Sequence, residues 1–239
     1  MARLHGHLCR AYLGARDISG DIASINPTFS AAAHDATTLG NEYIVNDPGL
    51  KSWECSMDGF YDPAAGGVGR QFEDLLGAVG GVLSIYDGSA DAIGDTGILC
   101  SDGVLTQRSQ PINVADLIKL SGTLVAATGG ANVGLYGKLL HPLGEETGTG
   151  TEASLNHGGS TANGGRANLH ITAITGTWTI KVEHSANDIA WADLATFSSK
   201  TAIGGSTLEV SGTVNQYLRA SATEDVAGSA TFVLGFARY

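Results

Sequence analysis

The chain has little of several features that mark common protein classes. Only 3 of its 239 residues are cysteine, only 5 are proline, and aromatic residues make up 7%. The cysteines, Cys9, Cys55 and Cys100, are odd in number and show no CxxC spacing. This pattern excludes a disulfide framework and a zinc knuckle, and it predicts small, buried, apolar side chains at these positions.

Long hydrophobic runs are also missing. The longest apolar stretch, 75–86, is interrupted by glycine and is too short to span a bilayer. Near the N-terminus Arg3, His5 and Arg10 interrupt any apolar run, so we expect no signal peptide and no membrane anchor. We expect the protein to be made in a cytoplasm and to stay soluble until it assembles.

Positive charge is scarce. The chain has 13 Lys and Arg against 24 Asp and Glu, a formal net charge of −11. Residues 1–150 hold 8 basic and 17 acidic side chains, a net of −9, whereas residues 151–239 hold 5 and 7, a net of −2. Tight binding of nucleic-acid phosphates needs Lys and Arg, so the composition excludes a protein that binds nucleic acid tightly. An acidic surface would instead let DNA pass without sticking; the alternative is that acidity only keeps the protein soluble.

Motifs for catalysis are absent as well. The sequence has no nucleophile elbow, no HExxH and no Walker motif, so we expect no enzyme, no catalytic residue and no cofactor. The neighbouring pair His34-Asp35 lies in a strand-like run, where adjacent side chains point to opposite faces and do not cooperate simply.

No metal site is expected either. Asp87, Asp91 and Asp95 lack the spacing of an EF-hand loop and the Glu that closes it. His5 and His7 could share a strand face, but two ligands make a weak site.

What the chain does contain is glycine, at 34 residues, with abundant Ser, Thr and Ala, which indicates short strands joined by turns. The organising stretch is 40–63. It begins as a polar arm, Pro48-Gly49 predicts a turn, and Trp53, Cys55 and Met57 then alternate with polar residues as in a half-buried strand. Such an arm cannot bury itself in its own domain. It either stays in solvent or lies on a neighbouring subunit, and we favour the second.

The remaining elements of the first part are mostly strands. One helix is expected at 71–79, with Phe72, Leu75, Leu76 and Val79 on one face and a stop at Gly80-Gly81. Strands are expected at 4–13, 29–39, 82–86, 97–107 and 112–125, with a break at Asn26-Pro27.

The second part is predicted to be a separate domain. Residues 143–165 are poor in apolar residues and rich in Gly, Ser and Thr, which favours a linker between a domain of residues 1–142 and one of residues 166–239. Six strands with regular turns are expected in the latter, with Trp178, Ile180 and Val182 on the buried face. That pattern favours an all-β sandwich of jelly-roll or Ig-like type. His170 and His184 are interpreted as packed or surface residues.

The sequence resembles the tail tube (major tail) proteins of long-tailed bacteriophages. The resemblance is spread over most of the chain. It is carried by residues 1–6, 16–20, 48–62, 178–185, 191–197, 212–220 and 231–238, including the patterns Trp178-x-Ile-x-Val-x-His-Ser and Thr231-Phe-x-x-x-Phe-Ala-Arg.

The resemblance implies a mainly β fold: a tail-tube-type β-sandwich or barrel with one flanking α-helix, followed here by a second all-β sandwich domain. It also implies a structural virion protein, located in the tail, whose rings stack around a DNA channel. Its partners would be copies of itself, other tail proteins at the tube ends, and double-stranded DNA passing an acidic lumen without tight binding. Because the two halves show no internal repeat, a ring of six subunits is favoured over one of three.

In that family an extended loop after the second strand reaches the adjacent ring, and 42–51 is the matching stretch here. The expected inter-ring contact residues are Glu42, Tyr43, Ile44, Asp47, Leu50 and Lys51. The alternative function is a virion fibre or adhesin, because the C-terminal part also resembles jelly-roll modules that bind sugars, with a turn at 184–191. A shared fold does not give a shared function.

Overall fold

A computed structural model describes residues 6, 9–64, 67–87, 92–127 and 134–239. Within these residues the chain is mainly β with a single helix, as the sequence predicts. The elements are, in order, β1 (Arg10–Leu13), β2 (Arg16–Asp17), β3 (Ile22–Asp35), β4 (Asn46–Phe60), α1 (Val68–Leu75), β5 (Gly81–Tyr86), β6 (Thr96–Ser109), β7 (Lys119–Ala126), β8 (Leu135–Glu146), β9 (Gly150–Thr151), β10 (Leu155–Asn156), β11 (Gly165–Ile174), β12 (Thr177–Ser185), β13 (Ala192–Lys200), β14 (Gly204–Val210), β15 (Tyr217–Val226) and β16 (Ala230–Arg238).

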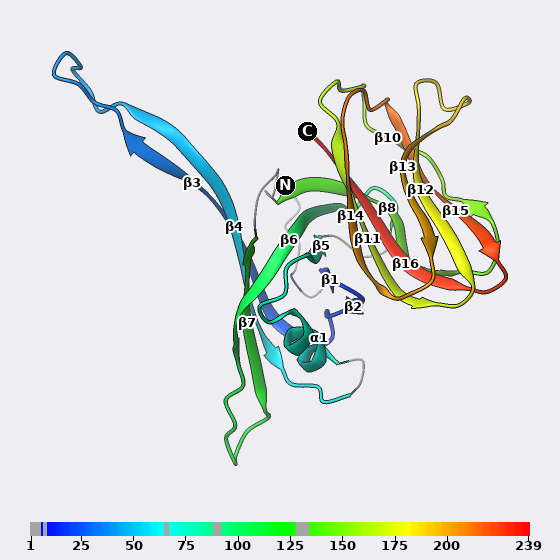
Figure 1. Ribbon diagram of the computed structural model, residues 1–239, viewed down its shortest axis with the longest axis horizontal. Helices are drawn as coiled ribbons and strands as arrows, with labels where there is room; N and C mark the ends of the chain where they lie inside the picture. The colour runs from blue at the N-terminus through cyan, green and yellow to red at the C-terminus, as the bar shows by residue number, and fades with distance from the viewer. Residues whose placement is uncertain (1–5, 7–8, 65–66, 88–91, 128–133) are drawn as a thin grey trace.

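In the described part of the chain, one sheet of eleven strands runs through both halves of the sequence. Its main path is β14-β11-β16-β8-β6-β5-β1-β2, and the second half of β6 adds a branch through β7 and β4 to β3. A second sheet has the order β10-β15-β12-β13, with β9 also on β15. Figure 1 shows the second sheet facing β11, β16 and β14 as a sandwich, with β3 and β4 projecting from the opposite side of the body.

The sandwich core follows from period-two patterning. Trp178, Ile180 and Val182 are fully buried, as predicted from their alternation. They pack against alternate residues of the facing strands β11 and β16, among them Leu169 and Phe232. Each of the six predicted C-terminal strands is present, at bounds close to those expected.

A second core lies under α1. Trp53, Cys55 and Met57 of β4 are buried there, as the sequence predicts, with Phe72 of α1. Gly122 on β7 permits the close approach, because a Cβ at that position would lie 2.5 Å from the Phe72 ring. Among the described residues no helix is long and apolar enough to cross a membrane.

The helix α1 is shifted toward the N-terminus relative to the predicted range 71–79. It begins at Val68, before the expected start, and ends at Leu75 instead of running to residue 79. Gly77 takes a positive φ of 75°, which ends the helix before Gly80-Gly81 can do so. Phe72 is therefore buried and Leu75 partly so, whereas Leu76 and Val79 are exposed.

The predictions of a break at Asn26-Pro27 and of a turn at Pro48-Gly49 are wrong. β3 continues through Asn26-Pro27, and β4 begins before Pro48-Gly49. Proline is tolerated at both places because β3 is an edge strand and because β4 pairs only with β3 until Glu54. The expected strand at 112–125 is shorter, since β7 starts at Lys119.

The segment 143–165, interpreted above as a linker, contains hydrogen-bonded strand. β8 continues to Glu146 and pairs with β16, while β9 and β10 each pair with β15. β8 also pairs with β6 through residues 135–138, so a single strand joins the two halves. The division into 1–142 and 166–239 stays a prediction.

Two fragments test that division. A fragment of residues 166–239 leaves the β16 edge without β8 and the β15 edge without β9 and β10, so we expect it to aggregate or to unfold without a sharp transition. A fragment of residues 135–239 keeps these strands and is expected to unfold cooperatively. Size-exclusion chromatography and two-dimensional amide NMR would compare them. A dispersed spectrum and equal melting temperature for 166–239 would instead support the predicted boundary.

Candidate assembly surface

The most exposed feature of the molecule is the arm, defined as residues 30–52 of the β3–β4 hairpin. β7 pairs with β4 only from Glu54 to Phe60, so beyond that point β3 and β4 pair with each other alone. Figure 1 shows this two-stranded ribbon projecting from the body. An isolated two-stranded ribbon is at best marginally stable in water, so the arm gains stability from any surface that covers it.

A β-bulge bends the arm at the residues that predicted a turn. Ala31 pairs with Lys51 and Ala33 with Pro48, so Gly49 and Leu50 together oppose Ala32. A bulge of this kind kinks the strand and increases its twist. The Pro48-Gly49 signal therefore marks a real irregularity, although the chain does not turn there.

The tip of the arm, residues 36–45, is held by its own hydrogen bonds. The amide of Ala36 donates to the carbonyl of Val45 at 2.8 Å, and the amide of Val45 donates to Thr37 Oγ1 at 3.0 Å. Thr37 also donates from its amide to the Asp35 carboxylate at 2.9 Å. Hydrogen bonds from the Thr37 side chain and backbone lower the pKa of Asp35, so this contact persists at neutral pH.

The arm carries all the residues predicted as inter-ring contacts. Glu42, Tyr43 and Ile44 lie in the tip loop, and Asp47, Leu50 and Lys51 lie on β4. All six are exposed, and the exposed fractions of Tyr43, Ile44 and Leu50 are 80%, 77% and 88%. Large apolar side chains that are exposed together, on a ribbon with no core of its own, are typical of an interaction surface.

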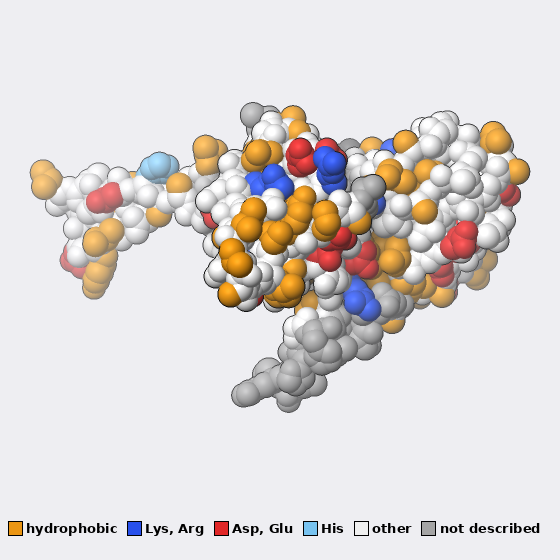
Figure 2. All heavy atoms as spheres, turned by 90° about the horizontal axis from the view of Figure 1, so that it is seen from below, with side chains coloured by type: hydrophobic (Ala, Val, Ile, Leu, Met, Phe, Trp, Pro, Cys, Tyr) orange, Lys and Arg blue, Asp and Glu red, His pale blue; other side chains and the backbone are white. Residues whose placement is uncertain are grey.

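A second apolar surface, the basal patch, lies at the end of the body formed by α1 and the β6–β7 loop. Figure 2 looks onto this end and shows hydrophobic side chains gathered there. We use the name basal patch for the large apolar side chains exposed on these two segments: Leu76 and Val79, which follow α1, and Ile112, Val114 and Leu117 in the β6–β7 loop, with exposed fractions from 50% to 106%. The sequence analysis placed several of these residues in a buried helix face or a strand and so missed the patch.

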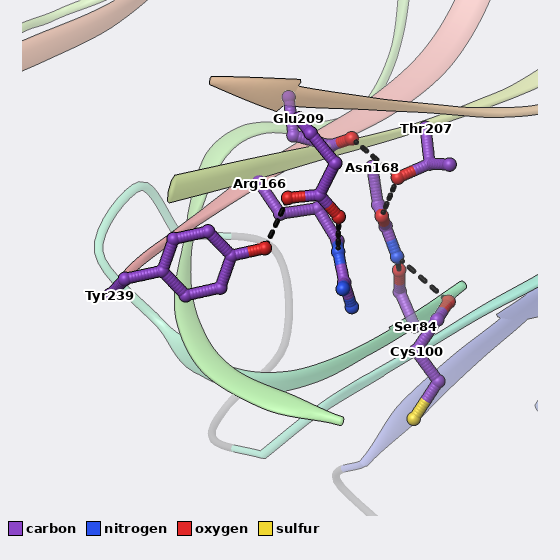
Figure 3. Close-up of polar contacts among 8 residues, drawn as sticks. Ser84, Cys100, Arg166, Asn168, Thr207, Glu209 and Tyr239 are labelled. Atoms are coloured by element: carbon purple, nitrogen blue, oxygen red, sulfur yellow. Dashed lines mark hydrogen bonds and ion pairs between the residues drawn. The ribbon is translucent and has the colours of Figure 1, made fainter. Parts of the chain in front are cut away.

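Buried polar residues of β11 connect the C-terminal strands to the first half of the chain. We call Arg166, Asn168 and His170, together with their partners, the polar joint. Asn168 of β11 donates to Ser84 Oγ at 3.3 Å and to the carbonyl of Cys100 at 3.1 Å, and it accepts from Thr207 Oγ1 at 3.0 Å. Figure 3 shows these contacts bridging β11, β14, β5 and β6. Two positions earlier on the same face of β11, the buried Arg166 pairs with Glu209 at 2.6 Å, and Glu209 also accepts from the Tyr239 hydroxyl.

His170 completes the joint. Its Nδ1 lies 2.9 Å from the Gly14 carbonyl and must donate to it, so its Nε2 accepts from Ser84 Oγ at 2.8 Å. Complete burial lowers the pKa of His170 to about 4, although the bond to Gly14 acts in the opposite direction. The histidine is therefore neutral at pH 7 and acts as a packed structural residue, one of the two interpretations given to it from sequence.

Other residues considered from sequence lie on the arm and in the core under α1. His34 and Asp35 lie on the exposed arm, opposite Asp47 and Asn46 on β4. Burial raises the pKa of the Cys55 and Cys100 thiols to about 12, which leaves both unreactive. His5, His7 and Asp91 lie outside the described residues.

A glycan platform would need an open aromatic face in the C-terminal sandwich. Trp178 is buried in the core, as expected. Trp191, at the end of the turn proposed for sugar binding, has the Arg219 guanidinium 4.1 Å above its ring, so that face is covered.

One cluster of possible metal ligands occurs among the described residues, and sequence reasoning missed it. His141, Glu146 and Glu152 place one ligand atom each within 4.8 Å of the others. No local pattern marks this cluster, because its spacing matches no known motif and because Glu152 is brought in by strand pairing.

Comparison with known proteins gives structural similarity only. No protein-family model matches the sequence, and no curated protein matches it. Eighteen solved chains match. A chain from the virion of a native gene transfer agent particle aligns over 53% of this chain and 96% of its own length, at 12% identity and a TM-score of 0.43.

Two further similar structures are a phage hub protein and an injection-system protein. The Dit protein of phage SPP1, described as a paradigm of the hub adsorption apparatus in phages infecting Gram-positive bacteria, aligns over 97% of this chain and 99% of its own. Its identity is 10% and its TM-score 0.38. The sheath/tube terminator of an extracellular contractile injection system aligns over 54% and 95%, at 13% identity and a TM-score of 0.41. These values identify no family, so the function is argued from the chain itself.

The neutral state of His170 predicts a pH dependence of stability. Its folded pKa of about 4 lies below the usual value near 6.5 of an unfolded chain, so between these pH values only the unfolded state binds the proton. The free energy of unfolding should therefore fall as pH decreases from about 6.5 to about 4, by on the order of 3 kcal/mol from this group.

A His170→Gln variant isolates that contribution. At pH 7 it should be less stable than the wild type by roughly 1–3 kcal/mol, and the difference should shrink toward pH 4. Urea unfolding at several pH values measures both proteins. Other titrating groups, including His157, whose pKa burial also lowers, are common to both and cancel in the difference. A difference that does not change with pH would contradict the assignment.

Proposed function

We propose that the protein is a structural subunit of a phage-tail-type tube, in which copies form rings that stack around a channel for DNA. The observation that carries the proposal is the arm. It is too long to pack on its own body, its tip is ordered by internal hydrogen bonds, and it ends in exposed apolar side chains. A second copy of the chain would bury those side chains.

The basal patch is the partner surface that we favour for the arm. An arm that meets the patch of the next copy makes a head-to-tail contact, which produces rings or stacks rather than closed two-fold dimers. The contact residues on the arm would be Glu42, Tyr43, Ile44, Asp47, Leu50 and Lys51. Rings of six are favoured over rings of three, as the lack of an internal repeat suggests.

Charge supports a role in which DNA passes without binding. Residues 1–150 carry the net charge of −9, and these residues include the arm and eight of the eleven strands of the large sheet. Carboxylates that face a channel would repel the phosphate backbone and keep a packaged duplex from adhering. The other partners would be the tail proteins that close the two ends of the tube, and the place of action would be the virion tail.

Substitutions at the arm tip test this function. A Tyr43→Ser/Ile44→Ser variant removes two large apolar side chains from the proposed interface, so we expect self-association at least tenfold weaker than in the wild type. Ile189→Ser is the matched control, because Ile189 is 81% exposed but lies in the C-terminal sandwich. Analytical ultracentrifugation gives the association constants, and negative-stain microscopy shows the particles.

Stacked tubes from the wild type would support the whole proposal. Single rings that do not stack would refute the stacking role of the arm, and a wild-type monomer at high concentration would refute the assembly itself. An arm variant that assembles as well as the Ile189→Ser control would exclude the predicted contact residues. Selective glycan binding by a protein that remains monomeric would favour the adhesin alternative.

A double-mutant cycle tests the pairing of arm and basal patch. Val114→Ser should weaken association by itself, since Val114 is fully exposed in the free chain and would be covered in the contact. If Tyr43 and Val114 lie in the same interface region, the loss in the Tyr43→Ser/Val114→Ser variant should be smaller than the sum of the single losses. Strict additivity, or no effect of Val114→Ser, would place the arm on another surface.

A further inference from the structure

His141, Glu146 and Glu152 meet at the open edge of the C-terminal sandwich, far along the chain from the arm. His141 Nε2 lies 3.2 Å from Glu146 Oε1 and 3.4 Å from Glu152 Oε1. The imidazole is almost completely buried, with 3% of the residue exposed, while the two carboxylates are about one third exposed. The cluster borders a cavity of about 240 Å³ lined also by Gly150, Thr151 and residues 220–222.

A β-bulge puts two of these residues on the same face of β8. His141 and Glu146 are five positions apart, which on a regular strand would turn them to opposite faces. The pairing of β8 with β16 shifts between them, because Leu234 pairs with His141 while Phe232 pairs with Gly144. The extra residue of β8 restores the common face. Glu152 joins from the other sheet, directly after β9, where its amide donates to the Ala220 carbonyl at 2.9 Å.

The hydrogen bonds of His141 define the state of its ring. Nδ1 lies 3.2 Å from the Phe232 carbonyl, which can only accept, so Nδ1 carries a proton. The ring also stacks on Phe232 at a centroid distance of 3.9 Å, which fixes its orientation. Nε2 is therefore aimed at the two carboxylates.

A neutral imidazole in this orientation would set its Nε2 lone pair against two anionic oxygens. Neither Glu146 nor Glu152 is paired with Lys or Arg in the described part of the chain, so no other side chain there neutralises them. A cation bound between the three groups would remove this repulsion.

We propose that His141, Glu146 and Glu152 bind a divalent transition-metal ion, of which Zn²⁺ is the best match. Nitrogen and carboxylate ligands at 2.0–2.2 Å from a tetrahedral zinc lie about 3.3–3.6 Å from each other, close to the two distances found here. The Nδ1 bond to a backbone carbonyl is the usual support for a histidine ligand. The adjoining cavity has room for a water as the fourth ligand.

Such an ion would join the two sheets of the sandwich. β8 belongs to the large sheet, whereas Glu152 follows β9, which pairs with β15 of the small sheet. β9 has only two residues, so backbone hydrogen bonds alone hold it weakly. The metal would fasten this segment, and its role would be structural and independent of the arm.

Metal binding by the full-length, tag-free chain tests the proposal. After treatment with EDTA and dialysis, titration with ZnCl₂ in a calorimeter should give one ion per chain and raise the melting temperature. MgCl₂ should not compete, because Mg²⁺ prefers an all-oxygen shell. In the wild type, Zn²⁺ should shift the ¹⁵N resonance of His141 Nε2 more than that of any other histidine.

Variants locate the site. Glu146→Gln and Glu152→Gln should each weaken Zn²⁺ binding at least about tenfold. Glu145→Gln is the matched control, because Glu145 is exposed on the opposite face of β8 and should bind like the wild type. Lack of Zn²⁺ binding by the wild type, or equal binding by all three variants, would overturn the proposal. The ¹⁵N shift needs no substitution, so the test stands even if a variant does not fold.

Discussion

The buried polar face of β11 determines how the molecule is put together. This strand is covered on both sides: its apolar residues fill the sandwich core, and Arg166, Asn168 and His170 face the first half of the chain. Leaving one such polar group without a partner costs about 1–3 kcal/mol. Asn168 and His170 find these partners in Ser84, Cys100 and Gly14 of the first half, whereas Arg166 pairs with Glu209 of β14, so the position of β11 is tied to both halves of the chain.

The packed cores of the body leave the arm as the part of the described chain that buries no apolar side chains of its own. The sandwich, the joint and the helix-covered core each bury their own apolar residues. The β3–β4 ribbon does not, since its outer half pairs only with itself. Because the arm is continuous with β4, which is anchored through Trp53 and Met57, a contact made at the tip acts on the whole body.

Two β-bulges lie at the two places for which a function is proposed, the arm and the cluster of His141, Glu146 and Glu152. One lies at Gly49-Leu50 and bends the arm; the other lies between His141 and Gly144 and turns a histidine and a glutamate toward the same side. Each contains or adjoins a proline, at Pro48 and Pro142, in a strand that continues through it. In both places a residue that weakens regular pairing sets the direction in which nearby side chains point.

The sequence by itself determined the mainly β class, the six C-terminal strands and the buried faces of β4 and β12, because a two-residue period reports burial directly. It also singled out the stretch from Glu42 to Lys51, which has too few apolar residues for a core. Only the tertiary structure decided that this stretch lies on the outer part of a β-hairpin, that Leu76 and Val114 are exposed, and that His141 meets Glu152. Edge position, sheet continuity and bulge register depend on which strands pair across long separations, and no local pattern in the chain encodes that.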